Sequence, residues 1–279
     1  MYTLHKNPEI LVSAEVAQEQ VQWARRRLSD ASAGLTFDPE EHRYFLGGRE
    51  LRSVSSIVEH FAPFDSVAVA RKCSANPKHP LFGQSPEEII AQWNLKRDNA
   101  AEAGTKVHAF AEACCSFLLG EEDKIEPELR ERITEEGLVA VEPKEIAAAL
   151  WWAETDWTRY AVVAKETRIV NPELGYAGTF DLLLYDIHKR TYPVRDYKTN
   201  EDLYKWYGDK LLPPLDFMRS NDIGKYTLQQ TSYTIQLRNI GIPVDSNELV
   251  WLKEEQYENV ALEMRYDRAI SYAIRQLNK

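Results

Sequence analysis

Three acidic residues recur at equal spacing in the second half of the chain. The interval from Glu166 to Asp181 equals the interval from Asp181 to Asp196. If this part folds into antiparallel strands with symmetric turns, Asp181 lies opposite Glu166 on one side and opposite Asp196 on the other. Directly opposed residues in a sheet have Cβ atoms about 5 Å apart, where like charges repel. The spacing therefore predicts a cation bound along this row.

The segments around these carboxylates have the composition of strands. Residues 162–170 are rich in β-branched side chains and end in an Asn-Pro turn signal. Residues 179–185 are apolar on both faces, which is typical of a central strand. In residues 192–198, alternation with a period of two places Asp196 and Lys198 on the same face. The register decides the prediction, because a slip of one residue turns a carboxylate to the opposite face.

Carboxylates and a lysine in this arrangement suit the hydrolysis of phosphodiesters. Carboxylate oxygens are hard ligands that favour Mg²⁺ or Mn²⁺, and a metal bridging Asp181 and Asp196 can polarise a phosphoryl oxygen. Lys198 can orient or deprotonate the attacking water, or neutralise charge on the phosphorane. An isolated Asp-x-Lys is common by chance and usually forms a surface ion pair. The prediction therefore depends on the surrounding motifs.

A helix is predicted from residue 104 to residue 118. Its apolar residues recur at helical spacing and form one stripe: Val107, Phe110, Ala111, Cys114, Phe117 and Leu118. His108 and Glu112 are four residues apart and share one face of this helix. A neutral His108 imidazole can be a further metal ligand, which would favour Mn²⁺. The alternative is a structural histidine at the edge of the apolar stripe.

Two later segments contribute polar and aromatic side chains. Residues 226–237 predict a helix on which Gln229 and Tyr233 form another pair four residues apart, able to bind a substrate phosphate or brace the site. Residues 203–210 interleave aromatic side chains, including Trp206, with lysines. Such a segment can stack unpaired bases, or it can be a loop packed on the core.

Four short motifs, taken in order, resemble the RecB-like exonuclease branch of the PD-(D/E)XK nuclease superfamily, and its phage-type members in particular. The resemblance covers about residues 100–260, and residues 42–57 are similar to the entry segment of phage-encoded members. The four motifs are Gly104-Thr105-x-x-His108, Gly178-Thr179-Phe180-Asp181, Asp196-Tyr197-Lys198-Thr199 and Gln229-x-x-x-Tyr233.

This resemblance implies an α/β fold with a restriction-endonuclease-like core, in which helices flank a central mixed β-sheet. It also implies metal-dependent cleavage of DNA. Lys198 would be the catalytic lysine, acting with Asp181 and Asp196. The implied metal ligands are His108, Asp181, Asp196 and the backbone carbonyl of Tyr197. The supporting or substrate-binding residues are Glu166, Gln229 and Tyr233 from the resemblance, and Glu112 and Trp206 from their positions.

Cysteine usage separates this chain from relatives that hold an iron–sulfur cluster. The chain contains Cys73, Cys114 and Cys115 and none beyond them, whereas a cluster generally needs four thiolate ligands. We therefore expect no iron–sulfur cluster. Three cysteines also indicate a reducing compartment. No Gly-x-x-x-x-Gly-Lys-Ser/Thr loop is present, so we expect a stand-alone nuclease or a subunit of a larger assembly.

Length and composition predict one folded unit. The 279 residues suffice for one substantial core; we place an N-terminal helical and hairpin extension at 1–98 and the nuclease core at 99–279. In the extension we predict a helix over residues 9–30 that carries the run from Arg25 to Arg27, a hairpin turning at Gly47-Gly48, and a helix that begins at the capping box of residues 85–88 and runs through Trp93. A further helix is predicted over residues 144–160, with Trp151, Trp152 and Trp157 as core residues. No apolar run reaches the length of a membrane span, and the first residues lack a signal-peptide pattern, so we expect a cytoplasmic protein without membrane contact. The net charge of −10 is unusual for DNA binding, although bound cations neutralise an acidic metal site.

These features predict a DNA exonuclease dependent on Mg²⁺ or Mn²⁺ that acts at linear or single-stranded ends. Its setting would be phage or bacterial replication, recombination or repair, with a replication or recombination protein as a possible partner. Three alternatives remain open. They are a flap or single-strand endonuclease on the same scaffold, a catalytically inactive relative that binds DNA or a partner, and a metal-dependent hydrolase of free nucleotides.

Overall fold

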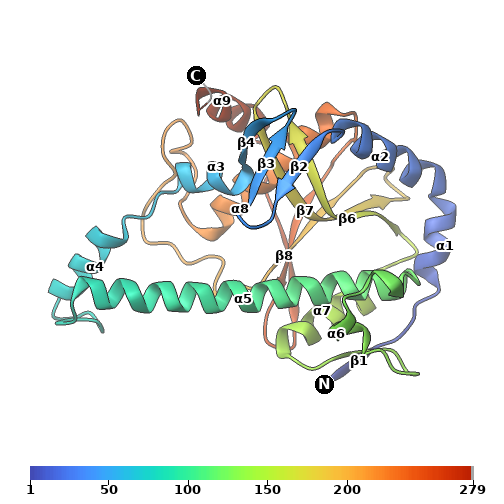
Figure 1. Cartoon of the computed structure of the whole chain (residues 1–279), viewed down its shortest axis with the longest axis horizontal. Coiled ribbons are helices and arrows are strands. Elements are labelled where there is room, and N and C mark those ends of the chain that lie inside the picture. Colours follow the sequence, from blue (N-terminus) through green and yellow to red (C-terminus); the bar gives the residue numbers. More distant parts are fainter. Residues whose placement is uncertain (278–279) are drawn as a thin grey trace.

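A mixed eight-stranded β-sheet forms the centre of the computed structural model, which describes residues 1–277 (Figure 1). Its strands are β2 (Leu35–Asp38), β3 (Arg43–Leu46), β4 (Arg49–Ser53), β6 (Tyr160–Asn171), β7 (Tyr176–Asp186), β8 (Val194–Lys198), β9 (Asn247–Leu252) and β10 (Tyr257–Ala261). The order is β10-β9-β8-β7-β4-β3-β2, and β6 pairs with β7. The β4–β7 and β8–β9 pairs are parallel, and the others are antiparallel.

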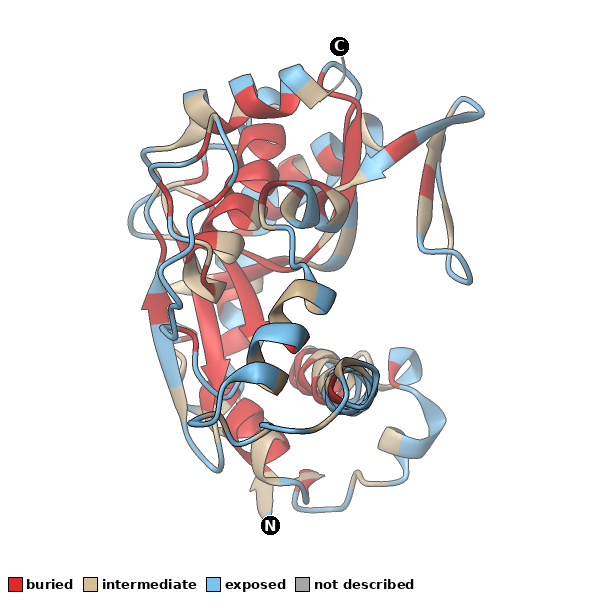
Figure 2. Ribbon diagram, turned by 90° about the vertical axis from the view of Figure 1, so that its left-hand side faces the viewer, coloured by how far each residue is buried: buried red, intermediate tan, exposed pale blue. Residues whose placement is uncertain are grey.

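Helices cover both faces of this sheet. The helices of residues 1–277 are α1 (Glu9–Val16), α2 (Gln18–Ala31), α3 (Val54–Phe61), α4 (Ser66–Ala75), α5 (Pro86–Leu118), α6 (Pro127–Arg130), α7 (Pro143–Glu154), α8 (Asp222–Asn239) and α9 (Asp267–Leu277), with a 3₁₀ turn at Glu122–Lys124. Buried residues of α2, α3, α8 and α9 share one apolar core with the sheet, and those of α5 and α7 share another. Figure 2 shows the buried residues concentrated in the strands and in the helices packed on them. The predicted α/β class, with helices flanking a mixed sheet, is confirmed.

A small second sheet lies beside α7. It consists of β1 (Tyr2–Leu4) paired antiparallel with β5 (Leu138–Ala140). Leu4 and Leu138 are both buried in the core that α5 and α7 share. The first strand of the chain is therefore packed against a segment from its middle.

The register of the carboxylate-bearing hairpins agrees with the prediction. In this register Glu166 lies across from Asp181 in one ladder. Extending the other ladder by one residue places Asp181 beside Asp196. The neighbouring pairs that fix both ladders are Lys165–Leu182, Thr167–Phe180 and Leu182–Arg195. The symmetric turns assumed from the sequence are therefore correct.

The helix α5 is longer than the sequence pattern predicts. Its N-terminal capping box is confirmed, because Ser85 Oγ accepts from the Glu88 amide at 3.2 Å and the Glu88 carboxylate accepts from the Ser85 amide at 2.9 Å. The sequence separates a helix ending near Trp93 from another beginning at Gly104, whereas the structure has one continuous helix. Residues 94–103 are all exposed, and this part of α5 extends past the sheet (Figure 1). It therefore needs no apolar stripe.

The segment before residue 98 contributes strands to the same sheet as the rest of the chain. The boundary expected between residues 98 and 99 lies inside α5. The predicted hairpin turning at Gly47-Gly48 is present as β3 and β4, and β4 enters the main sheet through its parallel contact with β7. Sequence composition does not indicate this pairing, because it joins strands that lie far apart along the chain.

Two further helix predictions need correction at their ends. The helix expected over residues 9–30 is divided into α1 and α2 at Ala17. The helix expected to reach Tyr160 ends at Glu154, and Trp157 follows it in a turn. Trp151, Trp152 and Trp157 are nevertheless buried, as predicted for core residues. Within residues 1–277, no helix combines the length and apolar character required to cross a membrane.

Candidate metal centre

Three side chains from three separate elements converge beside β7. His108 on α5, Glu166 on β6 and Asp181 on β7 each offer one ligand atom, and these atoms lie within 4.8 Å of one another. The Nδ1 atom of His108 is 3.4 Å from Oδ2 of Asp181. One imidazole nitrogen and two carboxylate oxygens form a donor set that suits Mg²⁺ or, with the nitrogen, Mn²⁺. The convergence of His108 and Asp181 agrees with their predicted positions.

The position of His108 follows from close packing of α5 against the end of β8. A Cβ atom added to Gly104 would lie 3.4 Å from Oγ1 of Thr199, so the helix axis passes close to the strand end. One turn later, the His108 ring meets the Tyr197 ring edge-on at a centroid distance of 5.9 Å. Tyr197 in turn contacts Trp151 of α7 at 5.7 Å. The apolar core on this face thus holds the histidine toward β7.

The backbone of Tyr197 orients Asp181. Its amide donates a hydrogen bond of 2.8 Å to Asp181 Oδ2, the same oxygen that faces His108. Sequence reasoning gave the backbone carbonyl of Tyr197 a role as a metal ligand, which stays a prediction. The structure adds a second role for this residue, because its N–H group fixes the direction of the Asp181 carboxylate.

Asp196 and Lys198 form an ion pair on the face of β8 turned toward α8. Nζ of Lys198 contacts Oδ2 of Asp196, which confirms that the two side chains share a face. The Lys198 ammonium also lies 4.5 Å from the centre of the Tyr226 ring. Among the described residues, Asp196 is not part of the three-residue ligand cluster. Its role as a metal ligand therefore stays a prediction, whereas its contact with Lys198 is established.

Glu166 occupies a more central position than the supporting role given to it from the sequence. It has a positive φ of 41° within β6, a conformation that costs about 1–3 kcal/mol for a residue other than glycine. The pairing of β6 with β7 shifts by one residue between Val162 and Ala164, and such bulges often redirect side chains near functional sites. The distorted strand therefore directs the Glu166 carboxylate into the cluster. Glu112, by contrast, pairs with Lys165 at 3.2 Å.

Repulsion and burial disturb the ionisation of the clustered carboxylates. Burial, together with repulsion from Asp196, raises the pKa of Asp181 to about 6 despite the nearby His108. Burial of the carboxyl group and then repulsion from Asp181 raise the pKa of Glu166 to about 8. Much of the Glu166 residue is exposed, so solvent weakens both the burial and the repulsion that raise its pKa. Excess negative charge at this point is what a divalent cation would neutralise.

Lys198 has the opposite shift. Burial disfavours its charged form, but the carboxylates of Asp196 and Asp181 outweigh burial and raise the pKa of the ammonium group above its ordinary value. In the metal-free protein the lysine is therefore a cation at neutral pH.

We expect the free energy of unfolding of the metal-free protein to fall as the pH rises through the neutral range. The folded protein binds a proton on Glu166 and on Asp181 more tightly than the unfolded chain does, because both folded-state pKa values are raised. The stabilising contribution of Glu166 is complete below its ordinary pKa of 4.5 and is lost as the pH rises through about 8. That of Asp181 is complete below its ordinary pKa of 3.8 and is lost as the pH rises through about 6. Urea unfolding in EDTA over this range measures the effect. Glu166→Gln should flatten the upper part of the curve, and an unchanged slope in that variant would contradict the assignment.

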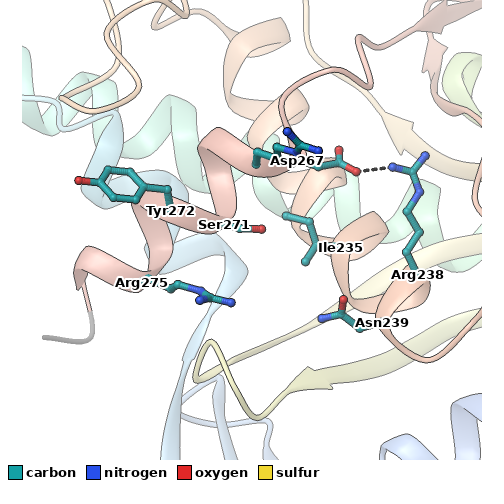
Figure 3. Close-up of a pocket in the computed structure, with 8 residues that line it drawn as sticks. Ile235, Arg238, Asn239, Asp267, Ser271, Tyr272 and Arg275 are labelled. Carbon is teal, nitrogen blue, oxygen red and sulfur yellow. Dashed lines mark hydrogen bonds and ion pairs between the residues drawn. The ribbon is translucent and has the colours of Figure 1, made fainter.

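A cleft of about 870 Å³ gives access to the cluster. His108, Glu112, Glu166 and Lys198 line it, and Phe37 and His42 of the β2–β3 hairpin border it. A different cleft, of about 470 Å³, lies between α8 and α9, where Arg238 pairs with Asp267 (Figure 3). This second cleft contains none of the residues predicted for the site. The cleft of about 870 Å³ is therefore the one that opens on the cluster.

Gln229 and Tyr233 lie on α8 close behind the carboxylates. Nε2 of Gln229 donates to the Tyr233 hydroxyl at 3.3 Å, and Tyr233 is buried. Burial, and next the negative charge of Asp196, raises the pKa of the Tyr233 hydroxyl well above its ordinary value. The tyrosine is therefore a neutral side chain that braces the strands from the α8 side.

Gly178→Ala should destabilise the fold and disturb the site. An added Cβ would lie 2.7 Å from a ring carbon of Tyr233 and 2.9 Å from Val54 Cγ2, and such overpacking costs about 1–3 kcal/mol. Thermal unfolding measures the loss. Gly104→Ala is the matched comparison, because that position is helical and in ordinary contact, so it should gain about 0.5–1 kcal/mol. Equal effects at both positions would contradict the packing argument.

Trp206 lies in the loop after β8 and is not among the residues that line the cleft. Its indole Nε1 donates to the Asp209 carbonyl at 2.5 Å, and the Arg219 guanidinium covers its ring at 4.6 Å. One ring face is thus engaged within the loop, although the residue remains 40% exposed. Its role in stacking bases stays a prediction.

Sequence reasoning missed three residues near the centre. Tyr226 lies over Lys198, Asn200 accepts from the Tyr226 hydroxyl at 2.8 Å, and Arg168 lines the cleft. Helical spacing could have identified Tyr226, because it precedes Tyr233 by two turns on the same face of α8. No comparable pattern marks Asn200 or Arg168.

Comparison with known proteins adds no assignment. No protein-family model matches the chain, and no curated protein matches its sequence. The resemblance to PD-(D/E)XK nucleases therefore depends on the sequence motifs.

Proposed function

We propose that this chain is a Mg²⁺- or Mn²⁺-dependent deoxyribonuclease with the restriction-endonuclease-like core of the RecB-like PD-(D/E)XK branch, and that it acts as an exonuclease. The observation that carries the proposal is the meeting of His108, Glu166 and Asp181 within 4.8 Å next to the strand that bears Lys198. Three of the four motifs thus supply residues to one cleft, and the fourth lies on α8 behind the carboxylates. A set of unrelated surface residues would have no reason to converge in this way.

The ligands for the ion would be the three clustered residues His108, Glu166 and Asp181. The sequence motifs predict two further ligands, Asp196 and the Tyr197 carbonyl. The donor set and the raised pKa values of Asp181 and Glu166 fit a divalent cation. When bound, this cation supplies positive charge that polarises the phosphodiester and promotes attack by water.

The protein's own groups position and stabilise the reacting phosphate. The Tyr197 amide holds Asp181 in its direction. Lys198 is cationic, and its contacts with Asp196 and the Tyr226 ring fix the ammonium beside the cleft. A cation held there neutralises the charge that develops on the phosphoryl oxygens. Its raised pKa supports this electrostatic role over proton abstraction from water.

The depth of the carboxylates favours a substrate strand that enters the cleft. Asp181 is 9% exposed and Asp196 1% exposed, so a cation that they hold lies below the protein surface and the phosphate must enter the cleft to reach it. A free end or an unpaired strand meets this requirement. The same geometry is compatible with a flap or single-strand endonuclease, which is the second candidate function.

The test uses end-labelled linear DNA, single- and double-stranded, beside a closed single-stranded circle, each with Mg²⁺, Mn²⁺ or EDTA. We expect metal-dependent shortening of linear DNA, with the circle intact. Cutting of the circle would establish the endonuclease instead. Absence of cleavage with both metals, combined with DNA binding, would indicate an inactive binding relative. Hydrolysis of free nucleotides without action on DNA would indicate a nucleotide hydrolase.

A further inference from the structure

Another cleft, which is lined by cationic side chains and is distinct from the one between α8 and α9, lies beside the metal centre on the side of β6. It has a volume of about 380 Å³ and lies between α2, β6 and the segment after α5. Its charged lining residues are Arg25, Lys124, Lys165, Arg168 and Glu121. Four cations and one acid are a strong local excess of positive charge in a chain whose net charge is −10. Acidic chains that bind nucleic acid need such local patches.

Two arginines in this cleft have guanidinium N–H groups that make no hydrogen bond within the described residues. Arg25 uses Nε to donate to the Val163 carbonyl at 2.7 Å, and no other bond of its guanidinium is present among residues 1–277. Arg168 covers the Phe37 ring at 4.6 Å, and no hydrogen bond or ion pair of its side chain is present in the same range. Each guanidinium thus presents a fork of N–H groups, the geometry that binds phosphate oxygens in pairs.

The two lysines complete the lining but are already paired. Lys124 contacts Glu121 at 2.8 Å, and Lys165 contacts Glu112 at 3.2 Å. Lys124 is largely exposed, so its charge remains available at the mouth of the cleft. The two arginines and the exposed Lys124 therefore provide the donors to phosphate, and Lys165 adds to the field that attracts an anion.

The cation-lined cleft shares a lining residue with the cleft of the metal centre. Arg168 lines both of them. Lys165 and Arg168 also lie one and two positions from Glu166 in β6, whose carboxylate belongs to the ligand cluster. If one phosphate of a polyanion lies at the metal centre, the neighbouring phosphate of the same chain therefore lies near these cations.

We propose that the cleft formed by Arg25, Lys124, Lys165 and Arg168 binds the phosphodiester backbone of a single DNA strand next to the phosphate at the metal centre. The proposal rests on the proposed function, since it takes DNA as the substrate. It identifies the direction in which the strand leaves the centre: across β6 toward α2. It also gives a role to one arginine of the Arg25 to Arg27 run and not to its neighbours.

The same run of arginines provides a matched control. Arg25, Ser29 and Ser32 follow one face of α2 and line the cleft, whereas Arg26 and Arg27 do not line it. Arg25→Gln and Arg26→Gln change the net charge equally. Because Arg25 also holds the Val163 carbonyl, Lys124→Gln serves as a second variant that leaves backbone bonds intact. Thermal unfolding of each variant confirms that it is folded.

The experiment measures binding of a fluorescent single-stranded 12-nucleotide DNA by anisotropy, as a function of salt. Ca²⁺ replaces Mg²⁺, and a gel confirms that the strand stays intact. Loss of one phosphate contact should reduce the slope of log K against log salt by about 0.7 for single-stranded DNA. Arg25→Gln and Lys124→Gln should show weaker binding with a smaller slope, and Arg26→Gln should retain the wild-type slope.

Failure of this proposal can be separated from failure of the nuclease assignment. Equal slopes for Arg25→Gln, Lys124→Gln and Arg26→Gln would overturn the strand-binding cleft even if the wild-type protein cleaves DNA. Wild-type protein that binds no single-stranded DNA would also overturn it. A smaller slope in only the two cleft variants would support it even if no cleavage is detected, in which case the proposed nuclease activity alone would be wrong.

Discussion

Lys198→Met is expected to lower the rate of metal-dependent DNA cleavage by about 10²–10³-fold, the usual consequence of removing one preorganised group that stabilises transition-state charge. The ammonium is held between Asp196 and the Tyr226 ring, and the Lys198 side chain is only 13% exposed, so solvent replaces its charge poorly. Single-turnover cleavage with enzyme in excess measures the effect on chemistry apart from product release. A rate close to that of the wild type would exclude Lys198 from the catalytic step.

The control for this variant lies on the same hairpin. Lys189 is in the turn between β7 and β8, where it pairs with Asp245 at 3.3 Å, so Lys189→Met removes the same charge without touching the cleft. We expect unchanged cleavage. Because Lys198→Met leaves Asp196 buried without its counter-charge, the unfolding midpoint is measured as well. Cleavage is then compared at a temperature at which both variants are folded.

Asp181→Asn is expected to have opposite effects on stability without and with metal. In EDTA at neutral pH, removal of a buried charge whose pKa is raised to about 6 should stabilise the protein by on the order of 2 kcal/mol. The asparagine oxygen can still accept from the Tyr197 amide, so the local fold is retained. With Mg²⁺ or Mn²⁺, the rise in unfolding midpoint that we expect for the wild type should be absent from this variant, together with cleavage.

Glu173→Gln is the matched control for Asp181→Asn, because Glu173 is exposed in the turn between β6 and β7. It should alter neither the metal-free stability nor the metal-induced shift. If Asp181→Asn destabilises the metal-free protein, or if it retains the full metal-induced shift, Asp181 is not part of a repelling ligand cluster.

The carboxylate row could be predicted from the sequence because its determinants are local. Two short turns fix the register of β6, β7 and β8, and the side chains alternate with a known period. The ion pair between Asp196 and Lys198 follows from the same alternation. Apolar spacing likewise predicted the part of α5 that carries His108, since that part is packed on the core.

Other features depend on contacts that a sequence pattern does not encode. The continuity of α5 through residues 94–103 was missed because that stretch is exposed on all sides and has no apolar periodicity. The bulge at Val163 and the left-handed conformation of Glu166 arise from the pairing with β7 and the packing around it. The sequence spacing places Glu166 in the carboxylate row, but only the structure shows its carboxylate clustered with His108 and Asp181.

The length of α5 has a mechanical consequence for the centre. The helix has 33 residues, roughly 50 Å at 1.5 Å per residue. Its inner half carries His108 and is embedded in the core, while its outer half stands free of the sheet (Figure 1). A rigid rod fixed at one end is a lever. We therefore expect that a partner bound near Pro86 would shift His108 relative to the carboxylates of the centre.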